Sequence, residues 1–167
     1  MTTTTMAAKN TTQIYRVYIK ATPEAVWDAI TKPEFAKRYG YCVPVDIDLR
    51  PGGKYRAYAN DGMKKYGAPE VIIEGEVIEV DPPRKLVQTW QPVWNPQGPQ
   101  EPPTRLTFEI KPDQGGTCKL TVIHDLTGAP TVAKTVGGED ETAGGGWAWV
   151  LSDLKTLLES GKGLSEK

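Results

Sequence analysis

Apolar and polar positions alternate along most of the chain, with a period of two over several separate segments. The segment Gln13–Lys20 (QIYRVYIK) places Tyr15, Val17 and Ile19 on one face, which is typical of a half-buried strand. The same pattern predicts further strands over residues 54–60, 70–80, 86–90, 105–111 and 117–126. Strands that follow one another without long helices between them pair as antiparallel hairpins.

Helical spacing appears at two places. After the first strand, Thr22 offers an N-cap, and the segment Pro23–Thr31 carries apolar residues three and four positions apart. A second short helix is predicted from Pro33. The longest helical pattern is close to the C-terminus, where Gly161 provides a stop. Its apolar residues are Trp147, Val150, Leu151, Leu154, Leu157 and Leu158.

This order of elements predicts an α+β helix-grip fold. A curved antiparallel sheet of about six to seven strands wraps around the long C-terminal helix, with two short helices after the first strand. An apolar pocket is expected between helix and sheet. Gly75, in the middle of the longest strand, predicts a bulge or kink where the sheet curves. Three glycines at 144–146 predict close packing or a mobile entrance to the helix, since each costs about 1 kcal/mol relative to alanine.

Two segments interrupt the pattern near the ends of strands. The proline-rich residues 92–103 cannot supply regular ladder donors and are expected to form a long loop. The acidic run Glu139–Glu141 precedes the final helix, and we interpret it as an interaction with the helix dipole.

Composition limits the classes of function. The 167 residues suit one domain, expected at 13–161, after a disordered segment 1–12 and before a polar tail 162–167. A net charge of -1 gives no reason to expect a nucleic-acid partner. No apolar run approaches the ~20 residues of a membrane helix, and no secretory signal is evident, so we expect a cytoplasmic protein without membrane insertion. Cys42 and Cys118 are expected to be reduced thiols. Neither a metal site nor a cofactor is expected, because no ligand-spacing motif surrounds the single histidine.

Several stretches resemble the SRPBCC superfamily, which includes START domains and polyketide cyclases. They are Thr22–Trp27 (TPEAVW), Thr31–Glu34 (TKPE), Arg50–Gly53 (RPGG), Gly75–Leu86 (GEVIEVDPPRKL) and Gly146–Leu154 (GWAWVLSDL). Within the superfamily, the chain is most similar to the family called activator of heat-shock-protein-90 ATPase homologue-like. The resemblance extends over nearly all of Thr12 to Gly161 and implies a ligand-holding cavity between sheet and helix.

The inward residues predict how such a cavity is lined. The expected ligand-binding residues are Tyr39, Tyr41, Tyr55, Trp90, Leu106, Phe108, Val122, His124, Trp147 and Leu151. The alternative for the tryptophans is plain core packing, since aromatic side chains contribute large buried areas in small domains. Trp94, in the proline-rich loop, leaves three alternatives open: a cap on the pocket, a homodimer interface, or contact with its own loop.

His124 is the candidate for chemistry because a histidine titrates near neutral pH and this one is on the inward face. The alternative is a histidine bonded to the backbone or to a tyrosine hydroxyl. Glu74, Glu76 and Glu79 could form a catalytic pair if they faced inward, but a solvated face is the simpler interpretation.

Three functions remain open at this stage. The first is the binding of an apolar or aromatic small molecule without catalysis. The second is a cyclase, dehydratase or hydrolase that uses His124 with a tyrosine such as Tyr55. The third is a protein-interaction module like the co-chaperone relative, with an exposed apolar patch around Trp94.

Overall fold

Seven strands pair into one antiparallel sheet in the computed structural model, which describes residues 11–166. The strands are β1 (Thr12–Ile19), β2 (Val45–Ile47), β3 (Lys54–Tyr58), β4 (Val71–Asp81), β5 (Lys85–Pro92), β6 (Thr104–Pro112) and β7 (Cys118–Asp125). Their order across the sheet is β1-β7-β6-β5-β4-β3-β2. Strands β2 to β7 therefore form a meander. The chain begins at one edge of the sheet with β1, crosses to β2 at the opposite edge, and returns strand by strand to β7, which pairs with β1.

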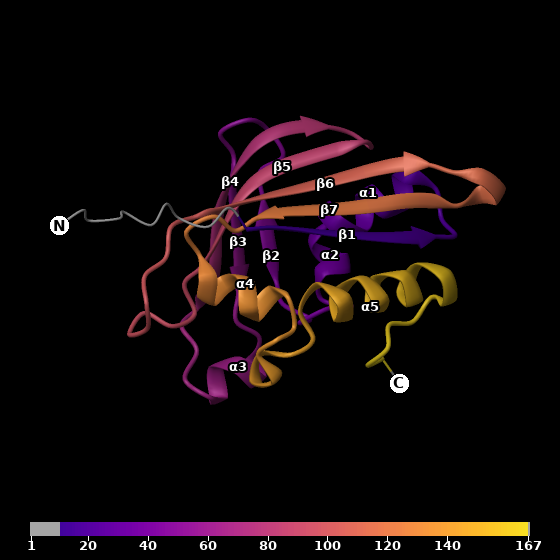
Figure 1. Ribbon diagram of the computed structural model, residues 1–167. Coiled ribbons are helices and arrows are strands. Elements are labelled where there is room, and N and C mark those ends of the chain that lie inside the picture. The colour runs from indigo at the N-terminus through magenta and orange to yellow at the C-terminus, as the bar shows by residue number, and fades with distance from the viewer. Residues whose placement is uncertain (1–10, 167) are drawn as a thin grey trace.

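Five α-helices are described along the chain. They are α1 (Pro23–Thr31), α2 (Pro33–Ala36), α3 (Asp61–Lys65), α4 (Pro130–Val136) and α5 (Gly146–Ser160). Helix α5 runs beneath β1, and α3 and α4 are on the same side of the sheet at one end of the molecule (Figure 1). Strands β2 and β3 run steeply across the direction of β1 and β7 in this view, which shows how strongly the sheet curls. The predicted helix-grip fold is confirmed.

Capping residues predicted from the sequence set the start of α1 and the end of α5. The Thr22 hydroxyl accepts a hydrogen bond from the Ala25 N–H at 3.1 Å and caps α1. Gly161 ends α5 with a φ of 83°, a left-handed conformation that favours glycine. At the start of α3, the Asn60 side chain accepts a hydrogen bond from the Met63 N–H and caps this short helix.

The interpretation of the acidic run Glu139–Glu141 is wrong. The Asp140 carboxylate accepts hydrogen bonds from the backbone and hydroxyl of Thr142, and it caps a 3₁₀ turn at Glu141–Ala143 instead. Helix α5 begins later, at Gly146, with no side-chain cap. The preceding segment contains α4, which the glycine-rich composition had concealed.

The bulge predicted at Gly75 is three residues further along β4. Opposite β5, Val77 pairs with Gln88 and Glu79 with Val87, so Ile78 is the extra residue. At Gly75 the two strands approach so closely that a Cβ would lie 2.1 Å from the Thr89 carbonyl oxygen. Glycine is therefore required where β4 bends.

Both ends of the described chain are tied to the sheet or to a helix. Residues 1–10, which were expected to be disordered, lie outside the described residues, whereas Thr12 already belongs to β1. At the other end, the expected polar tail folds back onto the molecule. Arg38 forms a salt bridge with Glu166, and the buried Asp153 carboxylate accepts a hydrogen bond from the Leu164 N–H.

Helix α5 covers one edge of the sheet. The Lys155 ammonium donates a hydrogen bond to the Tyr18 carbonyl oxygen of β1 at 2.8 Å. The Glu159 carboxylate accepts one from the Lys20 N–H at 2.9 Å. These side chains engage backbone groups of an edge strand that another strand could otherwise pair with.

Candidate functional site

The concave face of the sheet divides into two halves with different packing. We call the inward residues of β1, β7 and β6 the filled half. The inward residues of β7 are completely enclosed, with Leu120 and Val122 at 0% exposed, whereas Phe108 on β6 and Tyr15 and Val17 on β1 keep some accessible surface. Helix α1 packs on β6 and α5 on β1, and they contribute Val26 and Leu154 to the same core. The centre of this half, along β7, is a close-packed apolar core.

The inward residues of β2, β3 and β4 form what we call the recessed half. Ala57 and Val77 are buried there, but several larger side chains keep accessible surface although they face the core. These partly accessible residues are Val45, Ile47, Tyr55 and Val80, and Tyr39 and Met63 pack beside them from outside the sheet. This half therefore has the character of a recess lined by apolar and aromatic groups.

His124 is at the boundary of the filled half and is completely buried. The Trp147 indole N–H donates a hydrogen bond to its Nδ1 at 3.1 Å. On the other side, its Nε2 lies 2.7 Å from the Thr104 hydroxyl oxygen, and that hydroxyl donates to the Trp90 carbonyl oxygen at 2.6 Å. The rings of Trp90 and Trp147 contact the imidazole edge-on.

These contacts determine the protonation of His124. Because Nδ1 accepts and the Thr104 hydroxyl uses its only proton on Trp90, the imidazole proton is on Nε2 and the ring is neutral. Burial lowers the pKa of His124 to about 4, and the nearby Asp125 charge only partly opposes this. Both nitrogens are engaged, which is the satisfied core histidine that the sequence left open as an alternative. Its partners are a threonine and a tryptophan, not backbone or tyrosine.

Tyr55 has the opposite character. Burial raises the pKa of its hydroxyl to about 12, yet the side chain keeps accessible surface. Within residues 11–166, that hydroxyl makes no hydrogen bond. Tyr39 is close enough for the two hydroxyls to interact electrostatically, but its own hydroxyl donates to the Ala29 carbonyl oxygen at 3.0 Å. Tyr55 is thus a deep, neutral hydroxyl with hydrogen-bonding capacity to spare.

Gln88 is the functional candidate that the sequence analysis missed. It is on the inward face of β5, paired with Val77 on one side and Leu106 on the other, and only 2% of its surface is exposed. Its side-chain amide makes no hydrogen bond within the part of the chain that the structure describes. No buried side-chain nitrogen or oxygen there is both fully enclosed and unpartnered, so this amide opens onto free space. The sequence did contain a signal, since Gln88 interrupts the apolar alternation of Leu86 and Trp90.

The residues predicted to line a pocket fall into three groups. Trp90, Leu106, Phe108, Val122 and Trp147 gather around His124, with Phe108 and Trp147 in edge-to-face contact at 6.0 Å. Tyr39 and Tyr55 meet in the recessed half. Leu151 is buried on α5 and belongs to the core. Tyr41 is not in the interior: it is 39% exposed, and its hydroxyl donates to the Ala143 carbonyl oxygen beside the entrance of α5.

The geometry does not favour acid–base chemistry by His124 and Tyr55. Strands β6, β5 and β4 separate the strands that carry them, and His124 has no free nitrogen. The carboxylates do not replace them, since Glu74, Glu76 and Glu79 are all exposed on the outer face.

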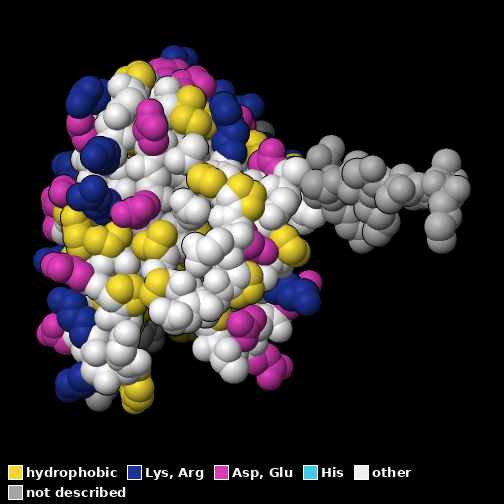
Figure 2. Space-filling model, turned by 90° about the vertical axis from the view of Figure 1, so that its left-hand side faces the viewer, with side chains coloured by type: hydrophobic (Ala, Val, Ile, Leu, Met, Phe, Trp, Pro, Cys, Tyr) yellow, Lys and Arg dark blue, Asp and Glu magenta, His cyan; other side chains and the backbone are white. Residues whose placement is uncertain are grey.

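Trp94 contacts the Trp90 ring edge-on, with ring centroids 6.1 Å apart, and Trp90 in turn contacts His124. It is 37% exposed. The loop that carries it is attached to α4, because the Glu101 carboxylate accepts hydrogen bonds from the Thr131 and Val132 N–H groups, both at 2.9 Å. On the face that Figure 2 shows, hydrophobic side chains gather in the middle among polar ones, and no histidine is visible.

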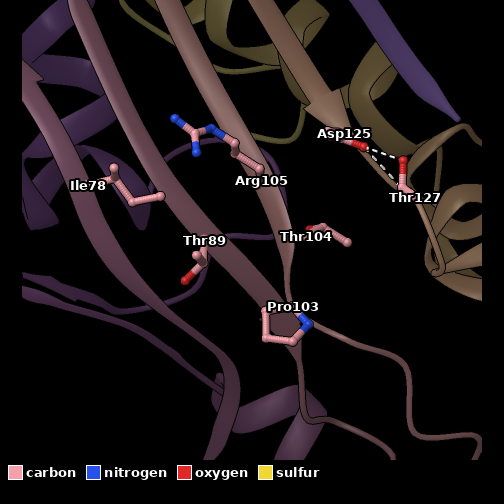
Figure 3. A pocket seen from close by; sticks show the side chains of 7 residues that line it. All are labelled: Ile78, Thr89, Pro103, Thr104, Arg105, Asp125 and Thr127. Atoms are coloured by element: carbon pink, nitrogen blue, oxygen red, sulfur yellow. Dashed lines mark hydrogen bonds between the residues drawn. The ribbon is translucent and has the colours of Figure 1, made fainter. Parts of the chain in front are cut away.

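Two hollows are on the outside of the sheet. One, of about 170 Å³, lies over β4 to β7 and is lined by Thr89, Arg105, Asp125 and neighbouring residues (Figure 3). Asp125 accepts a hydrogen bond from the Thr127 hydroxyl in it. The other, of about 340 Å³, follows the charged outer face of the β2–β3 hairpin. Neither lies between α5 and the sheet, where the sequence predicts the pocket.

Further features bear on cofactors and on membranes. Cys42 and Cys118 are both free thiols. Among residues 11–166, no three His, Cys, Asp or Glu side chains are arranged to hold a metal ion. In the same range, no helix has both the length and the apolar character that crossing a bilayer requires.

Comparisons with known proteins identify relatives of this fold. The family model described as activator of Hsp90 ATPase homolog 1-like protein matches residues 20–159. A comparison with curated proteins finds no match. Among solved structures, protein MLL2253 from Mesorhizobium loti is 23% identical with a TM-score of 0.67, over 89% of this chain and 97% of that one.

Two other similar structures carry more informative descriptions. CalU16 from Micromonospora echinospora is 22% identical with a TM-score of 0.55, over 83% of this chain and 82% of its own. An HSP90 activator from Plasmodium falciparum is 19% identical with a TM-score of 0.62, over 89% of this chain and 96% of its own. At such low identities the likeness shows the fold alone, because the same fold supports different functions.

Proposed function

The chain belongs to the activator of Hsp90 ATPase homolog 1-like family, and from that premise we propose that it binds an apolar or aromatic small molecule in the recessed half of the concave face. The observation that carries the proposal is the unequal packing of this face. Val45, Ile47, Tyr55 and Val80 of β2, β3 and β4 keep accessible surface while they face the core, whereas the inward residues of β7 are all enclosed and those of β6 are enclosed except Phe108.

The chemistry of the lining supports a ligand that is largely apolar. Val45, Ile47 and Val80 supply apolar surface, and Tyr39 and Tyr55 add aromatic faces. Binding pockets for small molecules combine such surfaces with a few polar groups that fix orientation. In this interpretation the protein holds its ligand without catalysis, since His124 is engaged on both nitrogens.

A fluorescence titration tests the proposal. N-phenyl-1-naphthylamine is neutral and aromatic, and we expect saturable binding with one site per chain. Val45→Phe places a larger ring in the recess and is expected to weaken binding at least about tenfold, or 1.4 kcal/mol. Asp46→Phe is the matched control, because Asp46 is on the same strand and points to the other face.

Two results would refute the proposal. One is the absence of saturable binding to a folded wild-type protein. The other is equal weakening by Val45→Phe and Asp46→Phe, which would place the probe on the outer surface. Thermal unfolding of each variant shows whether it has folded before its binding is compared.

A further inference from the structure

Gln88 stands among apolar neighbours, with no hydrogen-bonding partner for its amide. Val77 and Leu106 flank it across the sheet, and Leu86 and Trp90 flank it along β5 on the same face. An unpaired amide in such a place costs about 1–3 kcal/mol relative to an apolar side chain of similar shape. The described residues contain no group that offsets this cost, but each polar atom of the amide keeps some accessible surface, so water or a ligand from outside the chain can supply the missing hydrogen bonds.

Nearby polar groups on this face cannot serve as that partner. His124 is in the same row of the sheet, beyond Leu106, and both of its nitrogens are bonded. Thr104 gives its hydroxyl proton to Trp90 and receives the one from His124. Within residues 11–166, the Tyr55 hydroxyl, like the Gln88 amide, makes no hydrogen bond.

Gln88 and Tyr55 are close enough to bind one small molecule together. Gln88 on β5 pairs with Val77 and Tyr55 on β3 pairs with Gly75, so the two are two strand spacings apart, with β4 between them, and offset by two residues along the strands. In a flat sheet this places their Cα atoms about 12 Å apart. Both side chains are on the concave face, and the bulge at Ile78 is on the strand between them.

The charge of the site limits the chemistry of the ligand. Burial keeps the Tyr55 hydroxyl and the His124 ring neutral, and glutamine carries no charge. The buried carboxylate of Asp153 is engaged by the Gly40 and Leu164 N–H groups. A charged ligand would therefore be buried without a counter-charge, which is unfavourable.

We infer that the ligand is an uncharged molecule with a hydrogen-bond donor beside an acceptor, as in a lactam or a carboxamide, and that Gln88 selects it. The Gln88 amide offers one acceptor and one donor side by side, so it pairs with such a group through two parallel hydrogen bonds. Tyr55 provides a third contact at the far end of the recess. This inference rests on the proposed function and adds the class of ligand to it.

Three bicyclic probes of similar size separate these contributions. 2-Quinolone has the donor beside the acceptor, 2-methoxyquinoline lacks the donor, and naphthalene lacks both. For the wild-type protein we expect 2-quinolone to displace N-phenyl-1-naphthylamine with an affinity about tenfold above that of 2-methoxyquinoline. In Gln88→Met this ratio should fall to about twofold or less, with naphthalene bound at least as well as before.

Gln91→Met is the matched control for the titration. It makes the same substitution on the same strand but on the opposite face, where the Gln91 amide donates to the Glu101 carbonyl oxygen. The tenfold preference should persist in this variant. A second measurement is the stability of the ligand-free protein, where removal of an unpaired buried amide in Gln88→Met should raise Tm by about 2–4 °C.

Failure of the inference and failure of the proposed function give different results. Probes that bind the wild type without discrimination, a preference that persists in Gln88→Met, or a Tm that falls in this variant would each overturn the inference alone. A crystal structure with only water at the Gln88 amide in the presence of bound 2-quinolone would do the same. If none of the four aromatic compounds binds, the proposed function is overturned as well.

Discussion

The two halves of one concave face are built from the same alternating strands, yet they pack differently. In the filled half, Leu120 and Val122 are fully enclosed under α1 and α5. In the recessed half, Val45, Ile47 and Tyr55 keep accessible surface beneath α2, α3 and the loops beside them. The strands therefore do not determine whether a core closes.

The polar side chains of the concave face also differ between its two sides, in whether their hydrogen bonds are satisfied. On the filled side, His124 is bonded to Thr104 and Trp147 with nothing left over. Toward the recess, Gln88 and Tyr55 have hydrogen-bonding capacity that the described residues do not use. Buried polar groups are normally satisfied, and a group that is not satisfied calls for an explanation. The difference distinguishes a structural polar cluster from a candidate binding site.

The largest expected effect comes from removing side-chain volume in each half. Leu120→Ala should lower the free energy of unfolding by about 3–4 kcal/mol, because it leaves a cavity in a closed core. Ile47→Ala should cost only about 1 kcal/mol, since part of that side chain is already accessible. Urea unfolding of both variants measures the two losses. Equal losses would mean that the halves are packed alike.

The next effect concerns the dependence of stability on pH. His124 has a pKa of about 4 in the folded state, below the 6.5 of an unfolded chain, so the unfolded state binds its proton first. Its contribution to stability is complete above pH 6.5 and is lost as the pH falls toward 4. The expected loss is about 1.4 kcal/mol per pH unit in this window.

The measurement is urea unfolding from pH 7 to pH 4 for the wild type and for His124→Asn. The difference between the two proteins isolates this residue from the carboxylates, such as Asp125, whose pKa is also lowered. We expect the variant to be less stable at pH 7 and to lose less stability on acidification. Parallel curves for both proteins would show that His124 is not held neutral by burial.

The smallest expected effect on stability comes from removing one tyrosine hydroxyl that is hydrogen-bonded and one that is not. Tyr39→Phe removes a hydrogen bond to the Ala29 carbonyl oxygen and should cost about 1 kcal/mol. Tyr55→Phe removes a hydroxyl without a described partner and should change the free energy of unfolding by less than about 0.5 kcal/mol. Thermal unfolding of ligand-free protein checks both. A marked loss in Tyr55→Phe would reveal that its hydroxyl stabilises the fold.

Local patterns were sufficient to predict much of the fold. The period of two in β1, β6 and β7, the Thr22 cap and the Gly161 stop are determined by residues adjacent in sequence. Helix α4 was missed because its glycine and threonine neighbours suggest a loop, while its N-terminus is stabilised by the distant Glu101. Such long-range caps leave no local signal.

The candidate site was predicted only in part, for a similar reason. Alternation identified His124 as inward, but whether its nitrogens are free depends on Thr104 and Trp147, which come from other elements. Alternation also places Gln88 inward, yet its lack of a partner is evident only when every neighbour is known. Tyr41 was assigned to the pocket because it is aromatic, and its position beside Ala143 depends on how the loops meet.

The most direct test of the two-halves account is a crystal structure of ligand-free protein under xenon pressure. Xenon enters apolar cavities that are large enough and leaves closed cores empty. The account predicts xenon beside Tyr55 and Val45 in the recessed half, and none between β7, β1 and α5. Xenon in the filled half, or none in the recess, would contradict it.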